Sequence, residues 1–342
     1  MFKQILVPLD GGTLAERALP VAARIARASG GSIILLRVVS PPVEYGYWNY
    51  SMPTATMTLG GLADADIDNA TDYLKGIAES SDLAGVHTSI EVHSGPAAMV
   101  IFNVTQTQHV DLVVMSSHGD TGLKRWVLGS VSQKVARHSP VPVLVLRRGQ
   151  ETLSKETHPL PYIERPMRIL VPLDGSALAK EALIPAAQLI AAIAAPGQAA
   201  MHLVQVIKPQ PLHGGQELDP TTKEHMLQRS KKYLGSITEH LKGGIAAQLK
   251  LTVTWSVAID ADAASAIIRV AENGEDAEGS GVFGGCDVIA MATHGRGGMQ
   301  RWAMGSITER VLQGAKLPLL IVRAQNKTGE IKVNEEEAIT LA

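Results

Sequence analysis

One run of seven residues occurs twice in the chain and decides the fold. The run ILVPLDG at residues 5–11 recurs unchanged at residues 169–175, an offset of 164. A second set of residues recurs at an offset of 176: His118, Gly119, Gly122, Arg125, Trp126, Gly129 and Ser130 correspond to His294, Gly295, Gly298, Arg301, Trp302, Gly305 and Ser306. The chain is therefore a tandem repeat of one unit, and the second copy carries about twelve extra residues between the two sets of matches.

Within each copy, short apolar runs alternate with residues at helical spacing. The first copy predicts strands at 5–9, 33–39, 89–92, 112–115 and 143–146, and helices at 15–26, 66–79, 97–106 and 130–137. The second copy predicts strands at 169–173, 201–207, 249–255, 288–291 and 319–322, and helices starting near 182 and at 222–241, 263–272 and 306–312. Pro20 and Pro185 should kink the first helix of their copy or mark its true start. The expected fold is α/β: two tandem doubly wound domains, each a five-stranded parallel sheet with helices on both faces.

The length of 342 residues fits two domains better than one. We expect the first domain at 1–148, a linker rich in proline and charge at 149–165, the second domain at 166–324, and a tail at 325–342. Most of the extra residues of the second copy fall in the stretch 272–285, which is rich in glycine and acidic residues and predicts a surface loop.

Composition and charge exclude several classes of protein. The chain is 45% hydrophobic and 19% charged with 4% aromatic residues, which is typical of a folded chain with aliphatic strands buried on both faces. Residues 1–150 carry 12 basic and 12 acidic side chains and residues 151–342 carry 19 and 21, which argues against a nucleic-acid partner. Neither a signal segment nor an apolar run of membrane-spanning length is evident, and the single Cys286 can form no disulfide within the chain. We expect a cytoplasmic protein with no membrane partner.

The segment after the fourth strand is the richest in chemistry. Ser116-Ser117-His118-Gly119 is followed after nine residues by Gly129-Ser130, and the second copy repeats this arrangement with Ala292, Thr293, His294, Gly295, Gly305 and Ser306. A Gly-Ser pair at a helix start leaves N–H groups without helical partners, and such groups bind phosphate. The alternative is that Ser130 and Ser306 are ordinary helix N-caps and that the glycines form tight turns.

An aspartate ends the first strand of each copy. Asp10 and Asp174 lie beside the crevice where a doubly wound sheet binds ligands, and a carboxylate there can accept hydrogen bonds from a ribose or a base. The alternative is that each caps the helix that follows.

These residues together resemble the universal stress protein family, in its tandem two-domain form. The resemblance rests on the ILVPLDG opening, on second strands ending in Val38-Val39 and Val206-Ile207, and on the Gly-x9-Gly-Ser segment before the last helix and strand. It implies ATP or AMP bound at the carboxyl ends of the strands, with magnesium as a companion of the nucleotide. The family pattern Gly-x2-Gly-x9-Gly-Ser/Thr lacks its first glycine here, because Ser116 and Ala292 stand in that place.

The resemblance also implies which residues bind the nucleotide. In the first copy these are Pro8, Asp10, Val38, Ser116, His118, Gly119, Gly129, Ser130 and Val131. In the second copy they are Pro172, Asp174, Val206, Ala292, His294, Gly295, Gly305, Ser306 and Ile307. Val131 and Ile307 would contribute main-chain N–H groups to the phosphates.

The functional signal of the other candidate residues is weaker. His118 and His294 each lack a spaced metal-ligating partner, so we expect structural roles for them and no metal site. Arg125-Trp126 and Arg301-Trp302 could contact the nucleotide or pack onto the next helix. The aromatic residues of the 45–50 segment could form a lid, a partner surface or a loop folded onto its own domain.

The sequence therefore favours a stress-response protein that binds adenine nucleotide in one or both domains and signals or protects through the bound state. Two alternatives remain: a slow ATP-hydrolysing or nucleotidyl-transferring enzyme of the same fold, and a nucleotide-free interaction protein. No Walker motif or nucleophile elbow is present, so no catalytic residue is assigned. The last strands, 143–146 and 319–322, are apolar enough to pair with each other within the chain or between chains in a homodimer.

Overall fold

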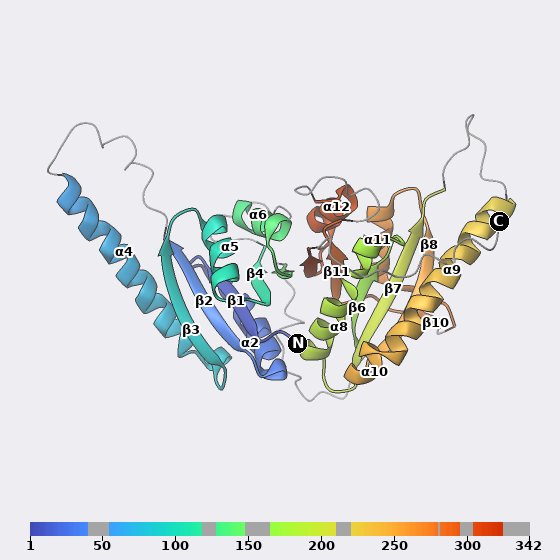
Figure 1. Cartoon of the computed structure of the whole chain (residues 1–342), viewed down its shortest axis with the longest axis horizontal. Helices are drawn as coiled ribbons and strands as arrows, with labels where there is room; N and C mark the ends of the chain where they lie inside the picture. The colour runs from blue at the N-terminus through green and yellow to red at the C-terminus, as the bar shows by residue number, and fades with distance from the viewer. Residues whose placement is uncertain are drawn as a thin grey trace, which may run out of the picture.

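The computed structural model describes residues 1–39, 55–117, 128–147, 165–209, 220–279, 281–294 and 304–323, without the side chains of residues 55–64. Its centre is one ten-stranded sheet with the strand order β3-β2-β1-β4-β5-β12-β11-β6-β7-β8. The two halves lie side by side, with the long helices α4 and α9 on the outer flanks (Figure 1). The tandem doubly wound α/β fold expected from the repeat is confirmed.

The first half contains five parallel strands and the helices that connect them. Its strands are β1 (Gln4–Leu9), β2 (Ser32–Val39), β3 (His87–Ser94), β4 (Leu112–Ser116) and β5 (Val143–Leu146). Its helices are α1 (Thr13–Glu16), α2 (Ala18–Ser29), α4 (Ala55–Ala78), the 3₁₀ turn η1 (Ser81–Leu83), α5 (Ala97–Thr107) and α6 (Ser130–His138).

The second half repeats this arrangement and adds a hairpin. Its sheet strands are β6 (Met167–Pro172), β7 (Ala199–Ile207), β8 (Thr252–Ile259), β11 (Val288–Ala292) and β12 (Leu319–Val322). Its helices are α7 (Ala177–Lys180), α8 (Leu183–Ile193), α9 (Pro220–Gly243), α10 (Ile245–Leu249), α11 (Ala263–Asn273) and α12 (Ser306–Gly314). The hairpin consists of β9 (Glu275–Ala277) and β10 (Gly281–Phe283).

The two halves join through their last strands. β12 pairs antiparallel with β5, with Leu320 opposite Leu144, so the pairing forms within the chain. Because the strands inside each half are parallel, this antiparallel pairing makes the strands of the two halves point in opposite directions. The carboxyl ends of the strands of one half therefore lie beside the amino ends of the strands of the other half at the seam. Both faces of the seam are covered, by α2 and α8 on one face and by α6 and α12 on the other (Figure 1).

Two core layers run through both halves, one on each face of the sheet. One layer contains Ile5 and Val7 of β1 with Ile169 and Val171 of β6, together with α2 and α8. The other contains Leu6 of β1 and Leu170 of β6, together with α6 and α12. Alternate residues of each strand enter opposite layers, which explains why the strands are apolar throughout instead of alternating with polar residues.

The prolines have the effect that the sequence predicted. The first helical segment breaks at Arg17, and α2 begins at Ala18, so that Pro20 lies in its first turn, where a missing N–H removes no helical bond. Pro185 takes the same place in α8, which begins at Leu183. Each proline therefore marks the true start of a helix.

Several expected elements had boundaries that differ from the structure, and three of them show this most clearly. α4 begins eleven residues before the expected start at residue 66, and β3 extends beyond the expected 89–92 at both ends. The strand expected at 249–255 is β8, which begins only at Thr252, because Leu249 ends the short helix α10.

The insertion expected to be a surface loop is partly an ordered hairpin, which corrects the prediction. Ala277 and Phe283 of the hairpin are buried in the core layer of α11 and α12. At the hairpin turn, the Glu278 N–H donates to the Trp255 carbonyl of β8 at 3.0 Å, and Lys231 of α9 pairs with the Glu278 carboxylate at 2.9 Å. The insertion therefore packs against the outermost strand of the second half.

Candidate functional site

Each half has a crevice at the carboxyl ends of two neighbouring strands. In the first half β1 lies between β2 and β4. The helix after β1 packs in one core layer, whereas the helix after β4 packs in the other. The chain therefore departs in opposite directions from the ends of β1 and β4, which is the switch point at which doubly wound sheets bind ligands. β6 and β11 form the corresponding point of the second half.

The aspartates at the ends of β1 and β6 organise the turns that follow them. Asp10 Oδ1 accepts the Gly12 N–H at 3.0 Å, and Asp174 Oδ1 accepts the Ser176 N–H at 2.9 Å and the Ser176 hydroxyl at 2.6 Å. The intervening Gly11 and Gly175 both have φ of +87°, a conformation that favours glycine.

Neither aspartate is a helix N-cap, so the capping alternative is wrong. The N-cap of α1 is Gly12, and the N-cap of α7 is Ser176, whose hydroxyl accepts the Ala179 N–H at 3.1 Å. Each carboxylate instead lies one turn before its helix, at the crevice.

The helices after β4 and β11 begin with N–H groups that have no partner within the helix. The first helical bonds run from the Gln133 N–H to the Gly129 carbonyl and from the Glu309 N–H to the Gly305 carbonyl, both at 2.9 Å. The N–H groups of Ser130, Val131 and Ser132 therefore precede the helical bonds of α6, and those of Ser306, Ile307 and Thr308 precede the bonds of α12.

The N-caps of α6 and α12 are Gly129 and Gly305. The expectation that Ser130 and Ser306 could be ordinary N-caps is therefore wrong. Both serines are the first helical residue and are exposed. Three successive N–H groups at a helix N-terminus form an arrangement suited to a phosphate.

These helix starts are attached to the ends of the preceding strands. The Gly129 N–H donates to the Ser117 carbonyl at 2.8 Å, and the Ser132 hydroxyl donates to the Ser116 carbonyl at 3.0 Å. In the second half the Gly305 N–H donates to the Thr293 carbonyl at 2.7 Å, and the Thr308 hydroxyl donates to the Ala292 carbonyl at 3.0 Å. The hydroxyl at the third helical position was not found from the sequence, although its recurrence at the offset of 176 is a signal that could have identified it.

The missing first glycine of the family pattern causes no backbone strain. Ser116 is the last residue of β4 and Ala292 is the last residue of β11, so both have extended backbone that any residue can adopt. The presence of serine or alanine in place of the family's glycine therefore requires no change in the backbone conformation at these positions.

The apolar residues expected to line a nucleotide pocket lie on one face of the sheet. Val38 and Val131 pack against the core layer of α5 and α6, and Val206 and Ile307 pack against its continuation in the second half. Pro8 and Pro172 follow Leu6 and Leu170 by two residues and so face the same layer. All six are half-buried. The structure thus brings strand-end apolar residues to the side of the sheet on which α6 and α12 begin.

Several predicted site residues lie outside the described residues. These are His118, Gly119 and Gly295, with Arg125, Trp126, Arg301, Trp302 and the 45–50 segment. His294 is described: its Nδ1 lies 3.0 Å from the Thr293 hydroxyl, and its buried Nε2 has no partner among the described residues. Within those residues, no three His, Cys, Asp or Glu side chains are grouped to hold a metal ion.

Sequence reasoning missed the side chains that connect the two domains. Arg147, just after β5, donates to the Leu312 carbonyl in the last turn of α12, and Arg323, just after β12, donates to the His138 carbonyl at the end of α6 at 3.3 Å. The two arginines are 176 positions apart, the same offset as the glycine repeats. Because a helix C-terminus carries partial negative charge, each arginine stabilises the end of the other domain's last helix.

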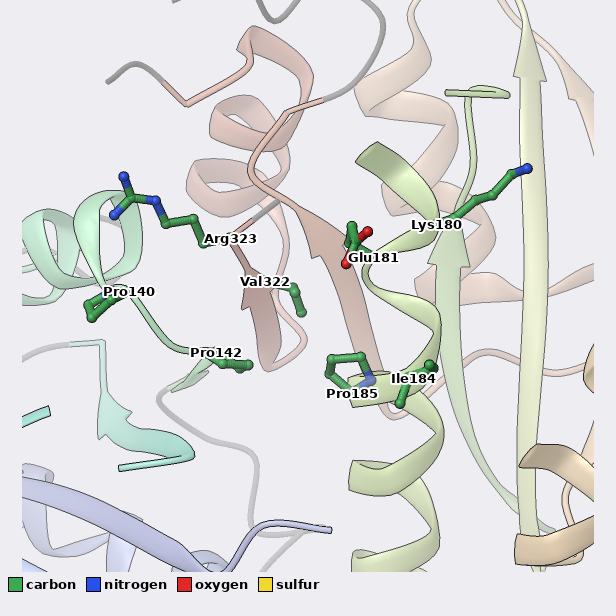
Figure 2. Close-up of a pocket in the computed structure, with 8 residues that line it drawn as sticks. All are labelled: Pro140, Pro142, Lys180, Glu181, Ile184, Pro185, Val322 and Arg323. Atoms are coloured by element: carbon green, nitrogen blue, oxygen red, sulfur yellow. The ribbon is translucent and has the colours of Figure 1, made fainter. Parts of the chain in front are cut away.

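A cavity of about 410 Å³ lies at the seam between the domains, separate from both crevices. Pro140 and Pro142 line it from the first domain, and Glu181, just after α7, lines it from the second domain together with Ile184 and Pro185 of α8. Figure 2 shows the Lys180 side chain directed away from the prolines, whereas the Arg323 guanidinium extends toward the side of the cavity on which Pro140 lies. None of the predicted site residues that the structure describes lines this cavity.

The class defined by this geometry is a duplicated doubly wound protein with one candidate anion-binding helix start in each half. The profile of the universal stress protein family matches residues 1–147 and 166–323. The chain therefore belongs to the universal stress protein family, as a tandem member with two such regions.

Relatives and solved structures agree with this assignment. A universal stress protein of Methanocaldococcus jannaschii is 28% identical over 154 residues, covering 43% of this chain and 84% of the relative. Universal stress protein YxiE of Bacillus subtilis is 29% identical over 158 residues, covering 43% of this chain and all of the relative (100%). A crystal structure of a universal stress protein from Archaeoglobus fulgidus is similar over 94% of this chain and 98% of its own, with a TM-score of 0.61 and 18% identity. That last likeness shows the fold.

Among the described helices, none combines the length and the apolar character needed to cross a bilayer.

Proposed function

We propose that this protein is a cytoplasmic stress-response module that binds adenine nucleotide, ATP or AMP, in one or both of its domains. The protein would act as a nucleotide-dependent signalling or protective module, in which the bound state alters a surface that partners contact. Binding would occur at the carboxyl ends of β1 and β4 in the first domain and of β6 and β11 in the second.

One observation carries the proposal: the same set of groups occurs at both crevices. Each has three N–H groups at a helix start, a strand-end carboxylate and half-buried apolar residues on one side. The N–H groups fit phosphate oxygens, the carboxylate fits ribose or base donors, and the apolar residues fit the face of a purine.

The residues fit nucleotide retention better than fast chemistry. Magnesium, if it accompanies the nucleotide, would neutralise the phosphate charge. The strand-end carboxylates already accept hydrogen bonds from their own turns, and this engagement favours a binding role over that of a base activating water.

The test begins with purified full-length protein that is denatured so that any released nucleotide can be identified by mass. ATP and AMP are then titrated while the melting temperature and the binding heat are followed. We expect released or titratable nucleotide, and we expect binding to fall in the double variant Ser130→Glu/Ser306→Glu. A carboxylate at the first helical position stabilises the helix start but repels phosphate, so this variant should fold.

Two outcomes would decide for the alternatives. If no nucleotide is released and neither nucleotide shifts the melting temperature, the protein is a nucleotide-free interaction protein. If ATP is turned over well above the rate of a Gly129→Ala/Gly305→Ala variant, the protein is an enzyme of the same fold.

A further inference from the structure

We infer that Arg137, a residue of the first domain, sets the phosphate affinity of the second domain's site by neutralising Glu309 at the start of α12. This inference rests on the proposed nucleotide binding and assigns a positioning residue to one of the two sites. It also implies that the two sites differ in how they receive a charged ligand.

The arrangement follows from the antiparallel pairing of β5 and β12. Since the two halves run in opposite directions at the seam, the end of α6 and the start of α12 come within reach of an ion pair. Arg137 is in the last turn of α6, and its guanidinium pairs with the carboxylate of Glu309 in the first turn of α12. The two side chains are 30% and 32% exposed, so water screens the pair only in part.

Glu309 is placed where its charge matters for an anion. It directly follows Ser306, Ile307 and Thr308, whose N–H groups precede the first helical bond. An acidic side chain in the first turn stabilises the helix start, but it also opposes the binding of a second anion there. Arg137 offsets that opposition, and Gln313 adds a hydrogen bond to the same carboxylate oxygen at 3.2 Å.

The neighbouring cation of α12 is engaged elsewhere. Arg310 forms two bonds of 2.7 and 2.6 Å with the Asp262 carboxylate at the start of α11. Those two charges cancel each other. Arg137 is thus the described cation that pairs with Glu309.

The repeat shows that the first site is built without this pair. At the offset of 176, Glu309 corresponds to Gln133 and Arg137 corresponds to Gln313. The start of α6 therefore carries a neutral amide where the start of α12 carries a carboxylate. Glu309→Gln copies the first domain's residue into the second and provides a matched control.

The experiment isolates the second site in the full-length chain. Ser130→Glu blocks the first site, and in this background ATP, AMP and adenosine are titrated by calorimetry at low and at high salt. Four versions are compared: the background itself, Arg137→Gln, Glu309→Gln and Arg137→Gln/Glu309→Gln. Arg137→Lys tests whether a positive charge alone is sufficient to maintain the affinity for ATP. The Ser306→Glu background, in which the second site is blocked, is used to measure the effect of Arg137→Gln on the first site.

We expect Arg137→Gln to weaken ATP binding about threefold to fivefold at low salt, the size of a charge effect within the first turn. The same variant should weaken AMP binding less than ATP binding and leave the binding of uncharged adenosine unchanged. High salt should reduce the loss of ATP affinity. The loss should vanish when Glu309→Gln is also present, and Arg137→Lys should restore most of the affinity. In the Ser306→Glu background, Arg137→Gln should leave ATP binding unchanged.

The outcomes separate this inference from the proposal on which it rests. If the unmodified chain binds no nucleotide, both are wrong. If the second site binds ATP but Arg137→Gln has no effect, or weakens adenosine as much as ATP, the inference alone is wrong, because a structural loss would not depend on phosphate charge.

Discussion

His202 of β7 should make the second domain sensitive to acid. The side chain is fully buried at 0% exposure, with Nδ1 at 2.8 Å from the Thr254 hydroxyl and Nε2 at 2.9 Å from the Ser256 hydroxyl. The Phe283 ring of the hairpin lies 4.2 Å away, centroid to centroid. Burial, with a smaller contribution from the Arg168 charge, lowers the pKa of His202 to about 3.

The magnitude follows from proton linkage. Below the ordinary pKa of about 6.5 the unfolded chain binds a proton at this histidine and the folded chain does not, so stability falls as the pH falls. Each pH unit between these two pKa values costs about 1.4 kcal/mol, so that we expect a loss of about 2 kcal/mol between pH 7 and pH 5. Burial raises the pKa of Glu275, which lies 3.3 Å from the Ser256 hydroxyl and acts in the opposite direction as the pH falls.

The assay compares urea unfolding at pH 7, 6 and 5 for the natural chain and for His202→Gln. Glutamine keeps two hydrogen-bonding atoms but cannot titrate, and Glu275 is present in both proteins, so the difference between the two pH slopes reports His202. His240→Gln, at an exposed position of α9, controls for the loss of a histidine. Slopes that coincide for the natural chain and His202→Gln would refute the buried neutral histidine.

Three further outcomes can be measured. Gly274→Ala should displace the hairpin, because an added Cβ would lie 1.8 Å from the Phe283 carbonyl, whereas Gly279→Ala has a similar positive φ but open space; if both variants lower the melting temperature equally, the clash is not the cause. Gly11→Ala should lower the free energy of unfolding by about 1–2 kcal/mol, because its φ is +87° and the Arg37 guanidinium would lie 2.8 Å from the new Cβ. Gly76→Ala in α4, which has open space, should leave the melting temperature unchanged or raise it. Cys286 is buried and its burial raises the pKa of the thiol to about 12, so a thiol reagent at pH 8 should label it only as fast as the second domain opens; rapid labelling of the folded chain would contradict this placement.

The fold could be predicted because the sequence contains two copies of the same unit. The strands 143–146 and 319–322 were placed without error, since each is a short apolar run buried on both faces and ended by polar residues or proline. The start of α4 was missed because Gly60 and Gly61 lower helix propensity, and tertiary context overrides such local preferences. The hairpin was missed because strands of three residues are too short to show a period.

The candidate site could be predicted in part. The residue types identified Asp10 and Asp174 as candidates, but they did not show whether each caps the helix that follows. The geometry of the turns decides this, because it makes Gly12 and Ser176 the N-caps. The contacts across the seam could not be derived, because the sequence left open whether the last strands pair within or between chains. The partners of Arg137 and Arg323 depend on that pairing.

Joining the two units in one chain changes what their pairing can do. When two separate copies associate through their last strands, the pairing weakens on dilution and both sides are identical. Here the partner strand is held at a fixed effective concentration, so the ten-stranded sheet persists however scarce the protein is. Covalent linkage also lets the two sides diverge: Arg137 meets Glu309, a combination that a symmetric pair of first domains, with glutamine at the position of Glu309, could not form.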